Sequence, residues 1–268
     1  MLPVSVFIIA KNEADRIAAT IQAVRVLSDD IIVIDSGSTD GTQKIAEELG
    51  AKVLFNPWPG YGMQKRFGED ACSHDWLLNI DADEVVPSDL CKEIEALFIK
   101  GEPTYQAYTM RIAEIFPGES KPHSWAYSLS PVRFYNRKAG RYSPSPVHDR
   151  VVLNPDVKIG HLKGTVHHYS VRSLGDQIDK LNRYTDWQAE DMEQRGIKLS
   201  LWRVIFEFPM AFFKAYFVRR HFVHGLYGFL LAMNHAFNRH LRIAKHYERR
   251  LLSKVPGHKQ EKDQQETS

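Results

Sequence analysis

Short apolar runs alternate with segments of helical spacing in the first part of the chain. Between the first two runs, Ile17, Ile21 and Val24 recur every three or four residues, as on the buried face of a helix. Strands that alternate with helices are typical of a parallel, doubly wound sheet, so we expect an α/β fold over residues 1–100. The runs predicted to be buried strands are 4–10, 31–34, 52–55 and 76–80.

A second helix is predicted between the second and third runs. Asp40 is placed to cap it, Gln43 stands at the third helical position as in a capping box, and Gly50 is placed to end it. A further helix is predicted over residues 88–100, directly after the fourth run.

The pattern changes after this helix. Two aromatic-rich segments, 105–112 and 132–136, are predicted strands separated by Pro and Gly, which favours a mixed sheet edge with long loops. Strand signals then give way to helical spacing. We therefore expect an α/β domain over 1–170, a helical region over 171–253 and a polar, disordered tail over 254–268.

One predicted helix of the C-terminal region is unusually apolar. Residues 203–218 carry a wide apolar surface, and the exceptions Arg203, Glu207 and Lys214 form one narrow polar stripe. A helix of this kind can lie flat in a membrane interface, or it can pack its apolar side on the α/β domain. The pattern alone supports both interpretations equally.

The net charge of +2 hides an uneven distribution. Residues 195–268 hold 14 Lys and Arg against 5 Asp and Glu, whereas residues 1–194 are net acidic. A basic C-terminal region predicts an anionic partner surface, and both membrane headgroups and nucleic acid meet that description. The longest stretch without Asp, Glu, Lys or Arg, 221–238, contains three His and two Asn, so no bilayer span is expected there.

The cysteines bear on the compartment. Cys72 and Cys91 match no paired metal spacing and are too few for a disulfide framework, which favours a reducing, cytoplasmic compartment. The apolar run 4–10 has no basic residue before it and no small-residue cleavage site after it. It is therefore predicted to be a buried strand rather than a signal peptide.

Polar residues follow three of the predicted strands. Because the carboxyl ends of parallel strands meet at one edge of a sheet, where ligands bind, these residues are expected to converge. Asp81 and Asp83 can hold Mg²⁺ or Mn²⁺, which bind through one or two carboxylates together with substrate phosphates, so a nucleotide diphosphate is the expected substrate. Asp35 can accept hydrogen bonds from a base or ribose, or act as a turn residue. The three segments are Ala10-Lys11-Asn12-Glu13, 35–42 and Asp81-Ala82-Asp83-Glu84.

These three segments resemble glycosyltransferase family 2. The nearer resemblance, over residues 3–247, is to its lipopolysaccharide core branch, which includes β-1,4-glucosyltransferases acting on inner-core heptose. The resemblance implies the GT-A fold, a Rossmann-like and mostly parallel twisted sheet flanked by helices, here with a C-terminal helical appendage. It also implies inverting, metal-dependent transfer of a hexose, glucose before other sugars, from a UDP-sugar donor to the lipopolysaccharide core. The further matching segments are Gly60-Tyr61-Gly62, Gln64-Lys65, Val147-His148-Asp149 and His168-Tyr169.

The resemblance assigns roles to individual residues. Asp83 would bind the metal and Asp81 the ribose or diphosphate, while Gln64 and Lys65 would face the donor. Arg66 departs from the branch, which often has Asn at that position. The other nucleotide-binding positions are Ala10, Asn12, Glu13 and Asp35.

An inverting transfer needs a carboxylate that removes the proton from the acceptor hydroxyl while its oxygen attacks the anomeric carbon. Asp149 is the candidate base, although the branch usually has the longer Glu there. Asp149 is equally able to act as a loop ion-pair partner for Arg150 or Arg133. Its rivals as base are Glu84, Glu114 and Glu119.

Basic and histidine residues are expected near the acceptor or diphosphate, namely Arg133, His148 and His168. Arg133 belongs to a basic cluster that can receive core phosphates or lie on a solvated loop face. The histidines do not favour zinc, because the adjacent His167 and His168 would point to opposite faces of a strand and no Cys accompanies them. The other members of the basic cluster are Arg137, Lys138 and Arg141.

Three alternatives remain open. Transfer to a polyprenyl phosphate or to another polysaccharide is the nearest, since no motif encodes the acceptor. A non-catalytic nucleotide-binding protein is disfavoured because no Gly-x-Gly-x-x-Gly follows the first strand. Nucleic-acid binding leaves Asp81 and Asp83 unexplained, so nucleic acid is not an expected partner. The expected setting is cytoplasmic, with peripheral attachment to the anionic inner face of the bacterial inner membrane.

Overall fold

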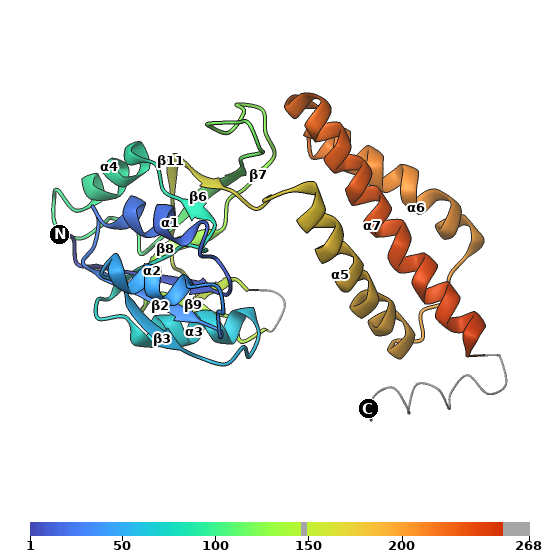
Figure 1. The fold of residues 1–268 in the computed structure, drawn as a ribbon. Coiled ribbons are helices and arrows are strands. Elements are labelled where there is room, and N and C mark those ends of the chain that lie inside the picture. Colours follow the sequence, from blue (N-terminus) through green and yellow to red (C-terminus); the bar gives the residue numbers. More distant parts are fainter. Residues whose placement is uncertain (146–148, 254–268) are drawn as a thin grey trace. The chain divides into compact units, whose positions relative to one another are not determined.

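The four N-terminal strands pair in parallel at one end of a large sheet in the computed structural model, which describes residues 1–145 and 149–253 (Figure 1). β1 (Val4–Ala10) pairs in parallel with β2 (Asp30–Asp35) and β4 (Trp76–Asn79), and β3 (Lys52–Phe55) continues the sheet beyond β2. These four predicted strands are confirmed, because the apolar side chains of β1, β2 and β4 are buried on both faces of the sheet.

Beyond β4 the sheet becomes mixed, in the order β3-β2-β1-β4-β8-β6-β11-β5. β8 (Val132–Asn136) runs antiparallel to both of its neighbours, β4 and β6 (Ala107–Glu114), whereas β11 (Ile159–His168) runs parallel to β6. β5 (Glu84–Val85) pairs antiparallel with the end of β11 and brings His168 opposite Glu84. The end of β11 therefore lies beside the segment that follows β4. The remaining strands form short antiparallel pairs: β7 (Ser128–Leu129) with β6, and β9 (Gly140–Tyr142) with β10 (Val151–Leu153).

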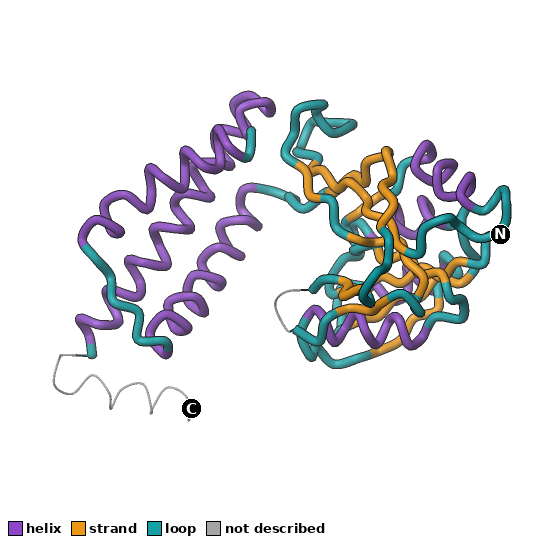
Figure 2. Tube along the Cα trace, turned by 180° about the vertical axis from the view of Figure 1, so that it is seen from behind, coloured by secondary structure: helices purple, strands orange, loops and turns teal. Residues whose placement is uncertain are grey.

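Helices cover both faces of this sheet (Figures 1 and 2). Val6 and Ile8 of β1 point into one core with three helices, and Phe7 between them points into the other core. On the Phe7 side, Gly68 lets its helix come so close that an added Cβ would lie 2.7 Å from the Phe7 ring. The doubly wound arrangement predicted from the sequence is thus confirmed. The helices on the first face are α1 (Ile17–Val24), α2 (Thr42–Glu48) and α4 (Ser88–Leu97), and the helix on the second is α3 (Tyr61–Ala71).

The prediction of a capping box at the start of α2 is wrong. Gly41 is the N-cap residue, with a left-handed backbone at φ 93°, so Asp40 lies outside the helix. The Asp40 carboxylate still accepts a hydrogen bond from the Thr42 backbone N–H, at 3.1 Å. The Gln43 amide turns away from it and donates to the Asp35 carboxylate at 2.5 Å. The Gln43 side chain, which a capping box would use, is thus hydrogen-bonded to the buried carboxylate of Asp35 instead.

The C-terminal helices form a second compact unit together with residues 116–119 and 123–127 of the loop between β6 and β7. The central helix of this unit, α7, packs against both α5 and α6 (Figure 1). Among the residues that the structure describes, none of the helices has the length and apolar character needed to span a bilayer. The predicted tail, 254–268, lies outside the described residues. The elements are α5 (Leu174–Gln194), α6 (Leu201–Phe213), the π-helical turn η1 (Lys214–Val218), the 3-10 turn η2 (His221–His224) and α7 (Gly225–Leu252).

Candidate active site

The carboxyl ends of β1 and β2 meet, with Ala10 paired to Asp35. The side chain of Asp35 is fully buried and accepts hydrogen bonds from Gly37 N at 2.8 Å, from Ser38 N at 2.9 Å, and from the Ser38 hydroxyl and the Gln43 amide. Burial alone would raise the pKa of Asp35, but these hydrogen bonds outweigh it and lower the pKa. Asp35 is therefore a charged residue that orders the loop after β2.

The loop after β1 is joined to the same β2 loop. Asn12 has a left-handed backbone (φ 57°), which Asn tolerates better than most residues, and its side-chain oxygen accepts a hydrogen bond from Thr39 N at 2.9 Å. The backbone N–H of Asn12 donates to the Ser38 hydroxyl at 2.8 Å, and that of Glu13 donates to the Thr42 hydroxyl at 2.8 Å. The two loops predicted to bind the nucleotide thus form one hydrogen-bonded rim.

Gln64, on α3, forms hydrogen bonds with the segments after β2 and β3. Its side chain is fully buried, its amide nitrogen donates to the Ser36 hydroxyl at 2.9 Å, and its oxygen accepts from the Asn56 side chain at 2.7 Å. The residue therefore ties the end of β2 to the end of β3.

Lys65, the next residue on α3, is buried at the centre of the site. Only 1% of its side chain is exposed, and its Nζ lies 3.0 Å from Asp81 Oδ1 and 2.6 Å from Asp149 Oδ2. Burial and the nearby charge of Arg133 lower the pKa of Lys65, but the two carboxylates outweigh them and raise it above its usual value. The ammonium is therefore charged at neutral pH and bridges two segments far apart in the sequence.

Arg133, on β8, contacts Asp81 from the other side. Its Nη2 lies 2.8 Å from Asp81 Oδ2 and 3.3 Å from Glu84 Oε1, and its Nη1 donates to the Asn79 side chain. Burial alone would raise the pKa of Asp81, but Arg133 and Lys65 hold it well below its usual range. Burial dominates at Glu84 and raises the pKa of that carboxyl. Asp81 is thus an ionised carboxylate held between two buried cations.

Asp83 faces a different set of partners. Its Oδ2 lies 3.4 Å from His168 Nε2 and 3.6 Å from Arg16 Nη1, and its backbone carbonyl accepts a hydrogen bond from Tyr169 N at 2.8 Å. Burial alone would lower the pKa of His168, but the hydrogen bond and charge of Asp83 outweigh it and raise the pKa to about 9. Asp81 and Asp83, two residues apart, therefore contact different partners, although the negative charge of Asp81 also acts on Asp83.

The structure separates the rival carboxylates. Glu84 is buried and accepts a hydrogen bond from the Asp81 backbone N–H at 2.9 Å. Glu119 belongs to the helical unit, where its carboxylate lies 2.7 Å from His224 Nδ1. Glu114 is at the end of β6 and accepts a hydrogen bond from the Ser170 hydroxyl at 3.3 Å. Asp149 pairs with Lys65, whereas the sequence left Arg150 or Arg133 open as its ion-pair partner.

The basic residues expected to cluster with Arg133 are distributed over other ion pairs. Lys138 Nζ lies 2.5 Å from Asp75, Arg141 Nη2 lies 2.8 Å from Asp70, and Arg137 donates to backbone carbonyls at the end of α3 and in the loop that follows. Of these four basic residues, Arg133 alone reaches the site. His148 lies outside the described residues.

Sequence reasoning did not identify Arg16, Asn79 or Tyr142. Arg16 pairs with Glu13 three residues earlier, with its Nε 2.9 Å from Glu13 Oε2, so the spacing was a usable signal. The Tyr142 hydroxyl donates to the Asn79 side chain at 2.6 Å. This contact joins segments far apart in the sequence, so no local pattern predicts it.

Two side chains of the site can act as ligands of a divalent cation. Asp83 and His168 offer an oxygen and a nitrogen side by side, a donor set that Mn²⁺ and related cations accept. No three His, Cys, Asp or Glu residues converge into a metal cluster within the described part of the chain. Mg²⁺ and Mn²⁺ in nucleotide sites need only one or two protein ligands, because the substrate phosphates supply others. The residues present therefore fit a cation that binds together with a diphosphate.

Sequence comparison assigns this site to a class. The model of "Glycosyl transferase family 2" matches residues 5–152, the part that contains Asp35, Lys65, Asp81 and Asp149. The chain belongs to glycosyl transferase family 2, has the GT-A fold and is a glycosyltransferase, as the resemblance implied.

Several relatives match nearly the whole chain. An uncharacterized glycosyltransferase of Rickettsia felis is 44% identical over 95% of this chain and 93% of its own length. The lipopolysaccharide core biosynthesis glycosyltransferase LpsC of Rhizobium meliloti is 30% identical over 96% of each chain. Among solved structures, S. aureus TarS 1-349 is 16% identical, with 84% of this chain and 73% of that chain covered and a TM-score of 0.48, too low to support a further conclusion.

Proposed function

We propose that this glycosyltransferase moves a hexose, glucose before other sugars, from a UDP-sugar to the inner-core heptose of lipopolysaccharide, with inversion at the anomeric carbon. The observation that carries the proposal is the convergence of Asp81, Asp83, Lys65 and Asp149 at the carboxyl edge of the sheet. The choice of acceptor is supported by the similarity to LpsC of Rhizobium meliloti along the whole chain.

In this proposal the joined loops after β1 and β2 receive the nucleotide. Asp35 accepts hydrogen bonds from the base or ribose, and the loop positions Ala10, Asn12 and Glu13 line the same pocket. Gln64 keeps the β2 loop in place through Ser36. The support is that these loops are fixed to each other by hydrogen bonds before any ligand binds, which lowers the entropy cost of binding.

Asp83, with His168 beside it, would hold Mg²⁺ or Mn²⁺. When bound, such a cation neutralises the negative charge that develops on a departing diphosphate. Asp81 binds the ribose or diphosphate, and its two cationic partners keep its carboxylate ionised and in one orientation. Arg133 adds positive charge where the diphosphate would lie, and His148 is proposed on the acceptor side.

Asp149 is the proposed base. The acceptor oxygen attacks the anomeric carbon, the bond from that carbon to the diphosphate breaks, and the acceptor proton passes to the Asp149 carboxylate. The ion pair with Lys65 supports this role, because it holds the carboxylate in one place while about a quarter of the side chain, 28%, stays exposed to an acceptor.

A lipid-linked acceptor also implies a place of action. We place the enzyme in the cytoplasm, peripherally bound to the anionic inner face of the bacterial inner membrane, with no nucleic acid as partner. The basic C-terminal region of the chain supports this setting.

The test is a transfer assay with the purified full-length chain. Heptose-terminated, truncated lipopolysaccharide is incubated with UDP-glucose, UDP-galactose or ADP-heptose, with Mn²⁺ or with EDTA, and the product is weighed by mass spectrometry. A gain of one hexose, from UDP-glucose and only with metal, is the expected result. Transfer to a polyprenyl phosphate in a parallel reaction, with none to lipopolysaccharide, would overturn the acceptor. Binding of UDP without any transfer would favour the non-catalytic alternative.

A further inference from the structure

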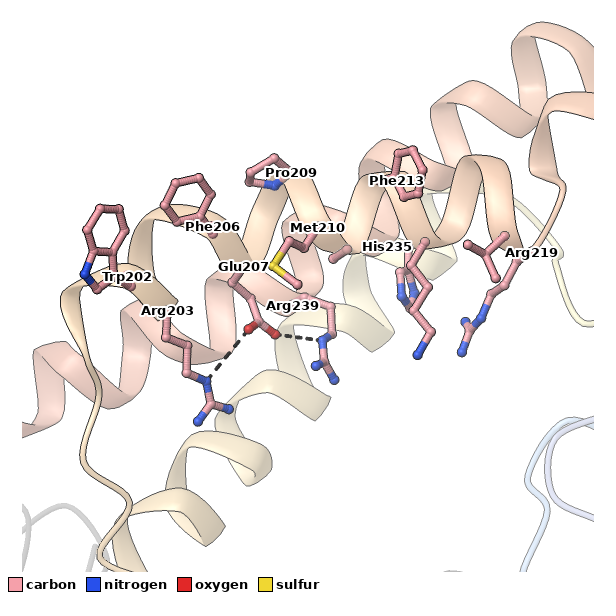
Figure 3. A pocket seen from close by; sticks show the side chains of 13 residues that line it. Trp202, Arg203, Phe206, Glu207, Pro209, Met210, Phe213, Arg219, His235 and Arg239 are labelled. Carbon is pink, nitrogen blue, oxygen red and sulfur yellow. Dashed lines mark ion pairs between the residues drawn. The ribbon is translucent and has the colours of Figure 1, made fainter.

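A row of large apolar side chains lies exposed along α6. Trp202 and Met210 are 71% and 68% exposed, and Phe206 and Phe213 are exposed at the helical spacing between and after them. Figure 3 shows Trp202, Phe206 and Phe213 along one edge of the helix, with Pro209 between them. Exposed aromatic rings aligned on one helix face are unusual for a surface in contact with water alone and indicate a partner.

Cationic groups border this row. A groove of about 1030 Å³ runs between the exposed apolar side chains of α6 and a set of basic side chains that includes Arg203, Lys214, Arg219 and Arg239. In Figure 3 the labelled arginines lie on the opposite side of the helix from the rings. From 201 to 252 the chain carries nine Lys and Arg against two Asp and Glu. The surface therefore combines an apolar edge with a strongly positive flank.

The acidic residue in this groove is already neutralised. Glu207 lies 2.9 Å from Arg239 Nε and 2.9 Å from Arg242 Nη2, and 3.8 Å from Arg203 Nε. Three arginines share one carboxylate, so the flank keeps an excess of positive charge beyond these ion pairs. That excess selects an anionic partner.

A second copy of this chain does not fit the surface well. A two-fold interface would place the same patch of each copy face to face, and the cations Lys214 and Arg219 of one copy would meet those of the other. A bilayer with anionic headgroups complements both parts of the surface. Its negatively charged headgroups match the positive flank, and the hydrocarbon directly beneath them matches the apolar edge.

We propose that α6 and η1 form a membrane-docking surface that lies flat in the interface of an anionic bilayer. The rings of Trp202, Phe206 and Phe213 and the side chain of Met210 enter the acyl region, while Lys214 and Arg219 contact lipid phosphates. This inference refines the peripheral location proposed above, but it does not depend on which sugar or acceptor the enzyme uses.

The experiment measures lipid binding without any sugar donor. The full-length chain is sedimented with vesicles of phosphatidylcholine alone, or of phosphatidylcholine with 30% phosphatidylglycerol, at about 0.1 M salt. Strong binding to the mixed vesicles and weak binding to the neutral ones is expected. Equal binding to both vesicles, or to neither, would overturn the proposal.

Two variants locate the surface. The double variant Trp202→Ser with Met210→Ser is expected to lower the vesicle partition coefficient at least about tenfold, because two apolar side chains that would insert into the bilayer are lost. Val26→Ser with Ile99→Ser removes two similarly exposed apolar groups from the first unit and should leave partitioning unchanged. A matching loss in this control would contradict the assignment to α6.

A charge variant covers the case in which the serine variant fails to fold. Lys214→Gln with Arg219→Gln keeps the apolar edge and is expected to abolish the preference for phosphatidylglycerol while leaving the melting temperature unchanged.

Light scattering tests the remaining alternative, which is that the patch joins two copies of the chain. A dimer that disappears in the serine variant, with no vesicle binding by the wild type, would identify the patch as an interface between copies.

Transfer to a soluble core oligosaccharide separates this inference from the proposed reaction. The serine variant should transfer sugar to it at the wild-type rate, because the acceptor carries no lipid. Loss of lipid binding with retained transfer supports the docking surface. Loss of transfer to the soluble acceptor as well would show that α6 serves the reaction itself and would overturn the proposal.

Discussion

The ammonium of Lys65 lies 2.6 Å from the carboxylate of Asp149, and it is the same buried ammonium that lies 3.0 Å from Asp81. One cation therefore links the segment after β4 to the segment before β10. Because Asp81 is proposed to hold the donor and Asp149 to accept the proton, Lys65 fixes the position of one group relative to the other.

Replacing Lys65 by Met should destabilise the protein by about 3 kcal/mol, since it leaves two carboxylates at a buried position without their shared cation. The change should also lower kcat, because Asp149 loses the contact that positions it. Urea unfolding and initial rates measure the two effects. Lys44→Met is the matched control, because Lys44 is an exposed helical lysine paired only at 3.8 Å with Glu48, and it should change stability by less than about 0.5 kcal/mol. Equal effects of the two changes would contradict the bridging role.

Asp149→Asn should reduce kcat by about 10²–10⁴-fold, the range typical of a lost general base, while UDP still binds. The amide keeps the size of the side chain but cannot take up the acceptor proton. Steady-state rates and calorimetric titration with UDP separate the two properties. Glu114→Gln tests the rival at the end of β6, and it should retain activity. A large loss in Glu114→Gln, with activity kept in Asp149→Asn, would assign the base to Glu114.

The strands that carry the site could be predicted because their signal is local. The apolar run 4–10 followed at once by Asn12 and Glu13 is readable without any knowledge of the fold, and so is the run that ends before Asp81. Parallel pairing then brings these ends to one edge as a matter of geometry.

The burial of Lys65 could not be predicted, because a lysine on a helix is ordinarily exposed. It is buried only because Asp81 and Asp149, far away in the sequence, supply the two charges that make burial of an ammonium tolerable. Arg133 is a similar case, since its partners Asp81 and Glu84 come from another segment. Long-range ion pairs of this kind leave no periodic trace in the sequence.

Asp83→Asn should abolish metal-dependent binding of UDP, while the melting temperature stays close to that of the wild type. The carboxylate faces His168 and Arg16 at the open edge of the sheet and does not fill the core, so its loss costs little packing. Calorimetry of UDP with and without Mn²⁺ detects the loss independently of turnover, and EDTA should reproduce it in the wild type. Asp29→Asn, an exposed aspartate outside the site, serves as control. Metal-dependent UDP binding that survives in Asp83→Asn would exclude this residue as the ligand.

Asp35→Asn should lower the free energy of unfolding by about 1–3 kcal/mol at pH 7, because the buried carboxylate that accepts hydrogen bonds from Gly37, Ser38 and Gln43 loses its charge. These hydrogen bonds hold the pKa of Asp35 below its usual 3.8 in the folded protein, although burial alone would raise it.

The stabilisation from Asp35 should therefore be fully present above about pH 4 and disappear as the pH falls through the folded-state pKa. Urea unfolding of wild type and variant at pH 7, 5, 4 and 3 tests this, and the difference between them should shrink at the acidic end. The same series with Asp29→Asn should run parallel to the wild type. If the Asp35→Asn difference stays constant down to pH 3, the carboxylate contributes through its shape and not through its charge.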